Sequence, residues 1–149
     1  PGGGFWADVS PETLSLTTLG GKGVGDPVNL ETSLTLSTPL GGHLVSGHVD
    51  GVGHVEQIIE DDRFWRVRIT SPANLARYIA MKGSICVDGT SLTVNQVAAN
   101  AFDLTIIPQT WEETVFSEYQ VGSPVNLEVD VIARYLERMM QVDADNAES

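Results

Sequence analysis

Apolar and polar residues alternate along eight short segments of the chain, and such a period of two predicts β-strands with one buried face. An acidic run at 60–62, the Asp88-Gly89 pair and Asn100 each predict a reversal between neighbouring strands. Many short strands with frequent turns predict an all-β protein. The predicted strands cover residues 6–9, 28–34, 52–59, 65–70, 85–88, 91–97, 102–107 and 125–129.

Helix signals occur at four places. Ser71 and Pro72, followed by Gly83, are matched start and stop signals that predict a helix between them. The blocks that begin at residues 11 and 108 each predict a helical turn. The last helix is predicted to begin after Asp130 as N-cap, and a polar acidic tail from residue 142 onward is predicted to be disordered.

The helix after Asp130 is amphipathic. It either packs on its own domain or forms a helical seam between subunits, and the pattern leaves both open. Its apolar face consists of Ile132, Tyr135, Leu136 and Met139.

A sequence repeat divides the chain. Residues 11–31 return as residues 108–128 without a gap, and ten of the twenty-one positions are identical, where chance gives about one or two. This similarity predicts two copies of one folding unit. About sixty residues complete the second copy on its N-terminal side, whereas only ten precede the first. We therefore expect the first unit to lack its N-terminal half, and the chain to be a fragment.

Composition narrows the class of protein. The chain has 149 residues and a formal net charge of −12, which disfavours nucleic acid as a partner. Its sequence lacks an apolar stretch of about twenty residues that would span a membrane, so we expect no membrane partner. The single Cys86 excludes a disulfide within the chain and a cysteine-rich metal site.

Three polar clusters could carry chemistry. The first is GGHLVSGHVDG at 41–51, and the second is VDGTSLTV at 87–94, where Ser91 and Thr93 share a strand face. The third is TIIPQT at 105–110, near which Asp130 arrives after the last strand. Each has a structural alternative, because hydroxyls on a strand often bond across the sheet and Asp130 can serve as a helix cap.

Several kinds of site are disfavoured. The histidine spacings match no compact metal site, and neither a G-x-S-x-G nucleophile turn nor a phosphate-binding loop is present. The residues by themselves predict a duplicated barrel with a polar pocket that needs no cofactor.

Several motifs in order resemble one family. GGHLVSGHVDGVG, KGSICVDGTSLTVNQV, IIPQTWEETVF and PVNLEVDVIARYLERM resemble the second lumazine-binding barrel of riboflavin synthases of the alpha-chain type, and ADVSPETLSLTTLGGKGVGDPVNLE resembles the back half of the first barrel. The resemblance implies tandem six-stranded antiparallel Greek-key barrels, the first incomplete here, plus a C-terminal α-helix. The implied parts are 1–43 in the first barrel, 44–129 as the second, and 130–149 as helix and tail.

The resemblance also implies an activity. Two molecules of 6,7-dimethyl-8-ribityllumazine exchange a four-carbon unit and give riboflavin and 5-amino-6-ribitylaminouracil, a transferase reaction without metal or redox cofactor. It implies a cytoplasmic homotrimer joined through the C-terminal helix, with lumazine synthase as a candidate partner. Because the family's site lies between barrels of different subunits, we expect the fragment to be inactive alone.

Specific residues follow from the matched motifs. Proton transfer and orientation are predicted for His48, Ser91, Thr93 and Asp130, with His48 as the natural proton carrier near neutral pH. The residues predicted to bind substrate are Asp8, Val9, Ser10, Pro11, Glu12, Thr13, Gly47, His48, Val49, Lys82, Thr90, Ser91, Leu92, Leu104, Thr105, Ile106, Ile107, Pro108, Gln109 and Thr110.

Two other functions remain open at this stage. One is a lumazine- or flavin-binding relative without turnover, such as an antenna protein. The other is an assembly module whose C-terminal helix recruits partners.

Overall fold

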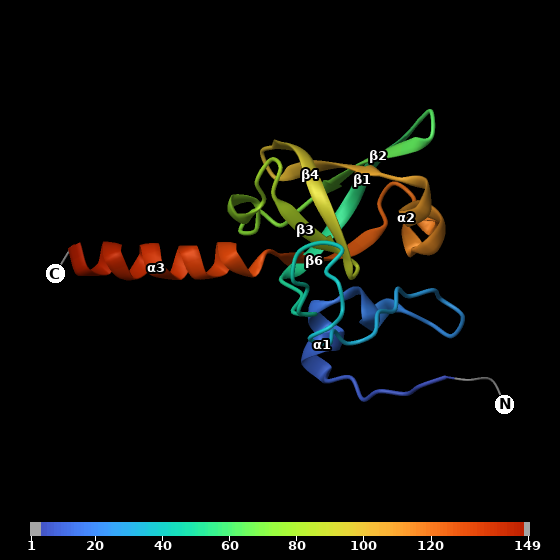
Figure 1. Ribbon diagram of the computed structural model, residues 1–149, viewed down its shortest axis with the longest axis horizontal. Coiled ribbons are helices and arrows are strands. Elements are labelled where there is room, and N and C mark those ends of the chain that lie inside the picture. Colours follow the sequence, from blue (N-terminus) through green and yellow to red (C-terminus); the bar gives the residue numbers. More distant parts are fainter. Residues whose placement is uncertain (1–3, 148–149) are drawn as a thin grey trace.

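Six antiparallel strands close into a barrel in the computed structural model, which describes residues 4–147 (Figure 1). Their order around the barrel is β1-β2-β5-β4-β3-β6, with β6 paired back to β1. Since β2 lies beside β5 and β3 to β5 follow one another, the arrangement is a Greek key. The strands are β1 (Gly51–Asp61), β2 (Phe64–Thr70), β3 (Ser84–Val87), β4 (Thr90–Ala98), β5 (Ala101–Ile106) and β6 (Pro124–Val129).

The barrel interior is filled by branched aliphatic side chains and one aromatic ring. Val67, Ile69, Ile106 and Leu127 are fully buried there, and Phe102 is almost so. Burying each such side chain is worth about 1.5–3 kcal/mol. A packed interior has no room for a ligand, so a binding site must lie on the outside of the barrel.

The six strands predicted from residue 52 onward are confirmed, and so are the reversals between them. The β3–β4 turn is made by Asp88 (φ 43°) and Gly89 (φ 82°), a pair of left-handed residues that suits a two-residue hairpin. Asp62 and Ala99 also have positive φ at the β1–β2 and β4–β5 turns.

The two repeated blocks share one backbone path. The helix α1 (Pro11–Leu16) and the 3₁₀ turn η1 (Thr18–Gly21) correspond to α2 (Pro108–Glu113) and η3 (Val115–Glu118). The linking residues Thr17 and Thr114 both have φ −127°, with ψ 169° and 174°. These pairs confirm the helical turns predicted after residues 11 and 108.

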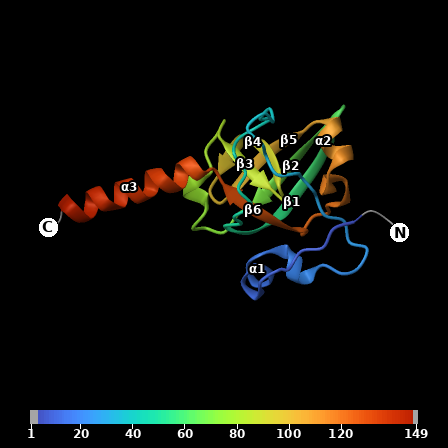
Figure 2. The same ribbon diagram turned by 60° about the horizontal axis from the view of Figure 1, so that its bottom comes forward.

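The first block, however, contains no strand, since the first strand in the described residues is β1, which begins at Gly51. The strands predicted at 6–9 and 28–34 are wrong, because a strand needs a hydrogen-bonding neighbour and residues 4–40 form none of the barrel pairs. Trp6 and Leu30 consequently keep 85% and 70% of their surfaces exposed. In Figures 1 and 2, this segment lies along one side of the barrel.

The helix predicted between Ser71 and Gly83 is also wrong. Only the three-residue 3₁₀ turn η2 (Ala76–Tyr78) forms there. The Ser71 hydroxyl donates to the Asn100 carbonyl instead of capping a helix. The turn buries Leu75 and Ile79 against the core, so tertiary burial outweighs the helix signals.

The helix α3 (Val131–Ala147) begins where predicted, with the Asp130 carboxylate accepting from the Ile132 N–H at 3.0 Å. It extends away from the barrel (Figure 1), and its four predicted apolar residues each keep at least 55% of their surfaces exposed. The helix also continues through 142–147, where disorder was expected, since no Gly or Pro interrupts it. Residues 148–149 of that predicted tail lie outside the described residues.

Between residues 4 and 147, no helix has the length and hydropathy needed to cross a membrane.

Candidate ligand-binding site

A row of polar side chains crosses the outer face of three adjacent strands. Cys86 on β3 pairs with Ser91 on β4 and with Glu128 on β6. Their strand neighbours face the core, so these three side chains point outward. Cys86 and Glu128 are nonetheless buried. Residues 41–50, here called the covering segment, contact this face at Ser91 and at Glu128.

Two polar anchors hold the covering segment on the barrel. At the first, the Ser91 hydroxyl lies 2.7 Å from His43 Nδ1 and accepts from the His43 N–H at 3.2 Å. At the second, Ser46 donates to Glu128 through its N–H at 2.7 Å and its hydroxyl at 2.8 Å. The buried carboxylate thereby gains the hydrogen bonds that its burial requires.

Gly42 lies directly before the first anchor. A Cβ at this position would lie 2.1 Å from Ser91 Oγ and 2.7 Å from Ser91 Cβ, so either the Ser91 side chain or the segment would have to move. The absence of a side chain therefore lets the backbone approach β4.

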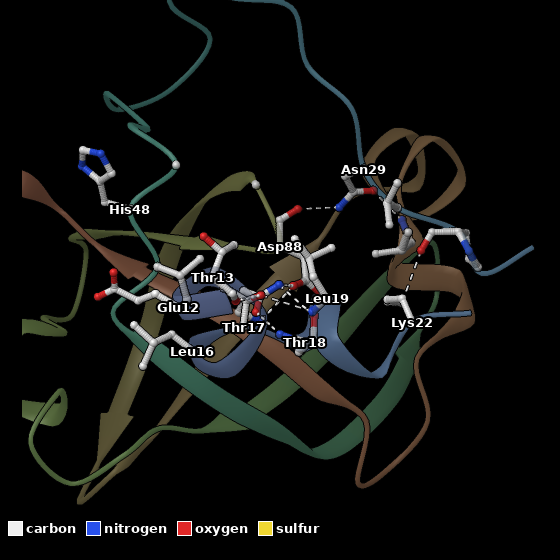
Figure 3. Close-up of a pocket in the computed structure, with 17 residues that line it drawn as sticks. Glu12, Thr13, Leu16, Thr17, Thr18, Leu19, Lys22, Asn29, His48 and Asp88 are labelled. Atoms are coloured by element: carbon white, nitrogen blue, oxygen red, sulfur yellow. Dashed lines mark hydrogen bonds between the residues drawn. The ribbon is translucent and has the colours of Figure 1, made fainter. Parts of the chain in front are cut away.

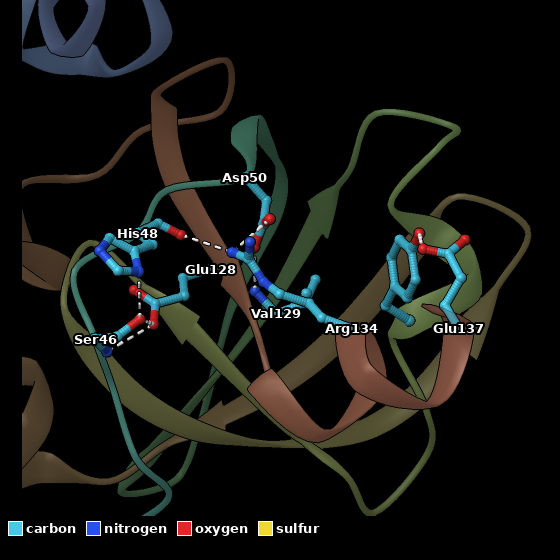
Figure 4. Close-up of polar contacts among 8 residues, drawn as sticks. Ser46, His48, Asp50, Glu128, Val129, Arg134 and Glu137 are labelled. Carbon is cyan, nitrogen blue, oxygen red and sulfur yellow. Dashed lines mark hydrogen bonds and ion pairs between the residues drawn. The ribbon is translucent and has the colours of Figure 1, made fainter. Parts of the chain in front are cut away.

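The two histidines of the covering segment have different surroundings. His48 Nδ1 lies 3.2 Å from the Ser46 hydroxyl, and Figure 4 shows its ring at the edge of this network. His43 bonds Ser91, and its Nε2 is buried without a hydrogen-bond partner in residues 4–147. The His43–Ser91 pair brings a hydroxyl and a proton-carrying ring together at one place.

Charged contacts join the covering segment to α3 (Figure 4). Asp50 contacts Arg134 at 2.6 Å and accepts from the Val129 N–H at 2.8 Å. Arg134 also donates to the His48 carbonyl at 2.9 Å. The base of α3 thus restrains the backbone beside His48.

Cys86 is not a candidate nucleophile. Burial, and then the nearby Glu128 carboxylate, raise the pKa of its thiol to about 12. The reactive thiolate is therefore scarce at neutral pH.

A pocket of about 550 Å³ lies beside this network, between residues 12–29 and the barrel (Figure 3). Hydroxyls, amides and carboxylates share its lining with aliphatic side chains. The lining residues are Glu12, Thr13, Leu16, Thr17, Thr18, Leu19, Lys22, Pro27, Val28, Asn29, Gly47, His48, Val49, Asp88, Gly89, Val115 and Asn126.

Some predicted substrate-binding residues meet at this pocket, and others do not. Glu12, Thr13, Gly47, His48 and Val49 line it together. The remaining predicted positions are absent from its lining: Asp8, Val9, Ser10, Pro11, Lys82, Thr90, Ser91, Leu92, Leu104, Thr105, Ile106, Ile107, Pro108, Gln109 and Thr110.

Three of the four residues predicted for proton transfer have separate hydrogen-bond partners, and Thr93 shares none of them. Ser91 contacts His43, whereas His48 contacts Ser46. Thr93 is exposed and lies opposite Ser84, and Asp130 caps α3. Their joint role stays a prediction.

Whether the site could hold a metal ion depends on how its His, Cys, Asp and Glu side chains are grouped. Across the described part of the chain, no three His, Cys, Asp or Glu residues are grouped so that they could hold a metal ion.

A model of the lumazine-binding domain family matches residues 46–130, which include every strand of the barrel. The chain belongs to the lumazine-binding domain family.

Relatives of this chain are similar along nearly its whole length. Riboflavin synthase from Photobacterium phosphoreum is 48% identical over 139 residues, covering 93% of this chain and 64% of that protein. The Mycobacterium tuberculosis riboflavin synthase is 46% identical, covering 95% and 72%, and that of Bacillus subtilis is 38% identical, covering 95% and 66%. The chain spans about two thirds of the length of these relatives.

Solved structures share the lumazine-binding fold. LumP complexed with riboflavin has a TM-score of 0.74 at 25% identity, covering 79% of this chain and 64% of LumP. LumP complexed with 6,7-dimethyl-8-(1'-D-ribityl) lumazine has a TM-score of 0.69, also at 25% identity, covering 76% and 60%.

The sequence predictions assign no binding or catalytic role to four polar residues of this domain. His43 and Ser46 lie in the Gly-rich cluster at 41–51, but nothing in their spacing shows that they face Ser91 and Glu128. Asn29 and Asn126 line the pocket and occupy equivalent positions in the repeat. Their identity in both copies was the available signal.

Proposed function

We propose that this chain carries substrate-binding parts of a riboflavin synthase, a transferase. The observation that carries the proposal is the similarity to riboflavin synthases, 38–48% identical across at least 92% of this chain. The reaction would convert two 6,7-dimethyl-8-ribityllumazine molecules into riboflavin and 5-amino-6-ribitylaminouracil.

The groups on the outer face of the barrel suit that chemistry. The ring system of the substrate delocalises the anion left when its methyl group loses a proton, so catalysis consists of positioning two rings and moving protons. Hydroxyls, imidazoles and backbone groups can do both. The His43–Ser91 pair and His48 offer such groups beside the pocket.

We assign proton transfer and orientation to His48, Ser91, Thr93 and Asp130 as proposed roles. Turnover by His48→Ala and Asp130→Asn in an intact protein with both barrels complete tests them, with His43→Ala as the comparison because His43 bonds Ser91 directly. A loss below about threefold, or about 0.7 kcal/mol of barrier, in both His48→Ala and Asp130→Asn would contradict these roles.

The proposed architecture follows the repeat. Residues 1–43 would be the C-terminal half of one lumazine-binding barrel, 44–129 the second barrel, and 130–149 the helix and tail. The shared path of the two blocks supports this division. The exposed apolar face of α3 supports a homotrimer through that helix, which sedimentation of Leu136→Glu beside the unchanged chain would test. A cytoplasmic location and lumazine synthase as a partner remain proposals from the resemblance.

Because the site is expected to need both barrels, the function is tested in an intact protein that contains this chain together with a complete first barrel. That protein is incubated with 6,7-dimethyl-8-ribityllumazine, and riboflavin is followed by absorbance and chromatography. One riboflavin formed for every two lumazines consumed would support the proposal. Tight lumazine binding without riboflavin would contradict it and favour a second candidate, a binding protein without turnover. The LumP complexes with riboflavin and with the lumazine favour that candidate, since LumP shares this fold at 25% identity.

A further inference from the structure

Two equivalent asparagines exchange hydrogen bonds across the repeat. Asn126, in the second copy, accepts from the Thr18 N–H of the first copy at 2.7 Å. Asn29, in the first copy, accepts from the Val115 N–H of the second copy at 2.9 Å. Asn29 matches Asn126, and Thr18 matches Val115, at the same offset of 97 residues. The exchange is therefore reciprocal.

The accepted N–H groups are ones that a helical turn cannot satisfy by itself. Thr18 and Val115 are the first residues of η1 and η3, so their N–H groups have no partner within the turn. The preceding threonines cap the next N–H groups, those of Leu19 and Phe116. Each 3₁₀ turn thus has one cap from its own repeat and one from the other.

Both asparagines also donate to Asp88 at the β3–β4 turn. Asn126 Nδ2 reaches the Asp88 carboxylate at 2.8 Å, and Asn29 Nδ2 reaches the Asp88 carbonyl at 2.7 Å (Figure 3). Tyr119 donates to the same carboxylate at 2.5 Å. Asp88 is therefore the shared centre of the exchange, and it lines the pocket with both asparagines.

The geometry points to Asn29 and Asn126 as positioning residues that act across the repeat boundary, each fixing the helical turn of the opposite copy. This inference rests on the proposed function, because the two turns follow α1 and α2, which hold the predicted lumazine-binding residues Pro11 to Thr13 and Pro108 to Thr110. A change in one repeat should therefore loosen the ribityllumazine-binding turn of the other.

Amide hydrogen exchange of the full chain, measured residue by residue with NMR, tests whether each asparagine protects the turn of the opposite repeat. The measurement needs no ligand. Asn29→Leu should speed exchange at Val115 by about five- to tenfold and leave Thr18 within about twofold, since one hydrogen bond is lost. Asn126→Leu should speed exchange at Thr18. Faster exchange only within the mutated repeat, or no change at either turn, would overturn the inference.

Two variants separate positioning from general loss of stability. Asn29→Asp keeps an oxygen that can accept from Val115 but loses the amide that donates to the Asp88 carbonyl, so protection of Val115 should return in part. Asn100→Leu removes an amide that donates to the Ser71 carbonyl, away from both turns, and should leave the ratio of exchange rates at Thr18 and Val115 unchanged. If Asn100→Leu reproduces the effect of Asn29→Leu on that ratio, the inference is wrong.

Enzyme kinetics test whether the hydrogen bonds of the two asparagines affect substrate binding. In the intact protein with 6,7-dimethyl-8-ribityllumazine as substrate, Asn29→Leu should raise KM about five- to tenfold with kcat within about threefold, and Asn29→Asp should restore KM in part. If KM is unchanged although each substitution speeds amide exchange in the opposite repeat, the asparagines do not affect substrate binding. Riboflavin synthesis as the proposed function would be left intact. If the intact protein without substitutions makes no riboflavin, the proposed function fails, and the amide exchange rates still decide whether the asparagines act across the boundary.

Discussion

Residues 11–31 and 108–128 are identical at ten of twenty-one positions but differ in the structure that they finally form. Both form a short helix followed by a 3₁₀ turn, and both have a left-handed glycine near the end, Gly25 at φ 98° and Gly122 at φ 94°. The PVNLE segment then becomes β6 in the second copy and pairs with β1 and β3. In the first copy, the same five letters form no strand. Turns are set locally, whereas a strand exists only where neighbouring strands accept its hydrogen bonds.

The two copies differ in how deeply they are buried, and this difference predicts the largest effect on the free energy of unfolding. Phe116 is fully buried, while its counterpart Leu19 is 38% exposed. Phe116→Ala should lower the free energy of unfolding by about 3–5 kcal/mol, and Leu19→Ala by less than about 1 kcal/mol. Urea unfolding followed by tryptophan fluorescence measures both. Similar losses in the two variants would show that the first copy belongs to the same cooperative unit.

Two adjacent glycines, Gly41 and Gly42, test where the chain after the first copy begins to pack against the barrel. Gly42→Ala should cost about 1–3 kcal/mol because its Cβ would strike Ser91, whereas Gly41→Ala meets nothing within 4 Å and should stay within about 0.5 kcal/mol. Thermal unfolding of both variants measures the contrast. Equal stabilities would mean that the covering segment is not held on the barrel.

Alkaline pH should lower the free energy of unfolding, because the Cys86 thiol is buried on the covered face of the barrel. The pKa of Cys86 is raised to about 12 in the folded chain, against about 8.5 in an unfolded one. Its stabilising contribution is full below about pH 8.5 and is lost as pH rises toward 12, by up to about 1.4 kcal/mol per pH unit. Urea unfolding of the unchanged chain and Cys86→Ala at several pH values should show a shallower decline in the variant. Parallel declines would argue against this burial.

The smallest predicted effect on stability comes from removing the equivalent threonine caps, Thr17 and Thr114. Thr114→Ala should lower barrel stability by about 1 kcal/mol because Thr114 caps the Phe116 N–H in a buried turn. Thr17→Ala removes the same bond from an exposed turn and should change barrel stability by a few tenths of a kcal/mol at most. Denaturant midpoints at equal m-values report the difference. A larger loss from Thr17→Ala would reverse the comparison.

Sequence pattern predicted the barrel strands well because their alternation coincides with burial in a closed sheet. It failed at 6–9, 28–34 and 72–82, where the local signals were of the same kind. At Ser71, the hydroxyl that predicts a helix cap bonds the Asn100 carbonyl instead. Such an outcome depends on a residue 29 positions away, which a local pattern does not contain.

The candidate site was only partly accessible to the same reasoning. The cluster at 41–51 was recognised as polar and Gly-rich, but its pairing with Ser91 and Glu128 depends on how the covering segment lies on β4 and β6. Likewise, the identity of Asn29 and Asn126 was visible in the repeat. The crossing of their hydrogen bonds to Val115 and Thr18 was not.

The sequence by itself determined the strands of the barrel, the left-handed turns, the shared helical turns of the two copies and the family, because period, turn chemistry and motif are local properties of the chain. Only the tertiary structure decided which copy of PVNLE forms a strand, which histidine contacts Ser91, and that each repeat caps the other. These outcomes depend on hydrogen-bond partners that lie far away in the sequence and meet only when the barrel closes.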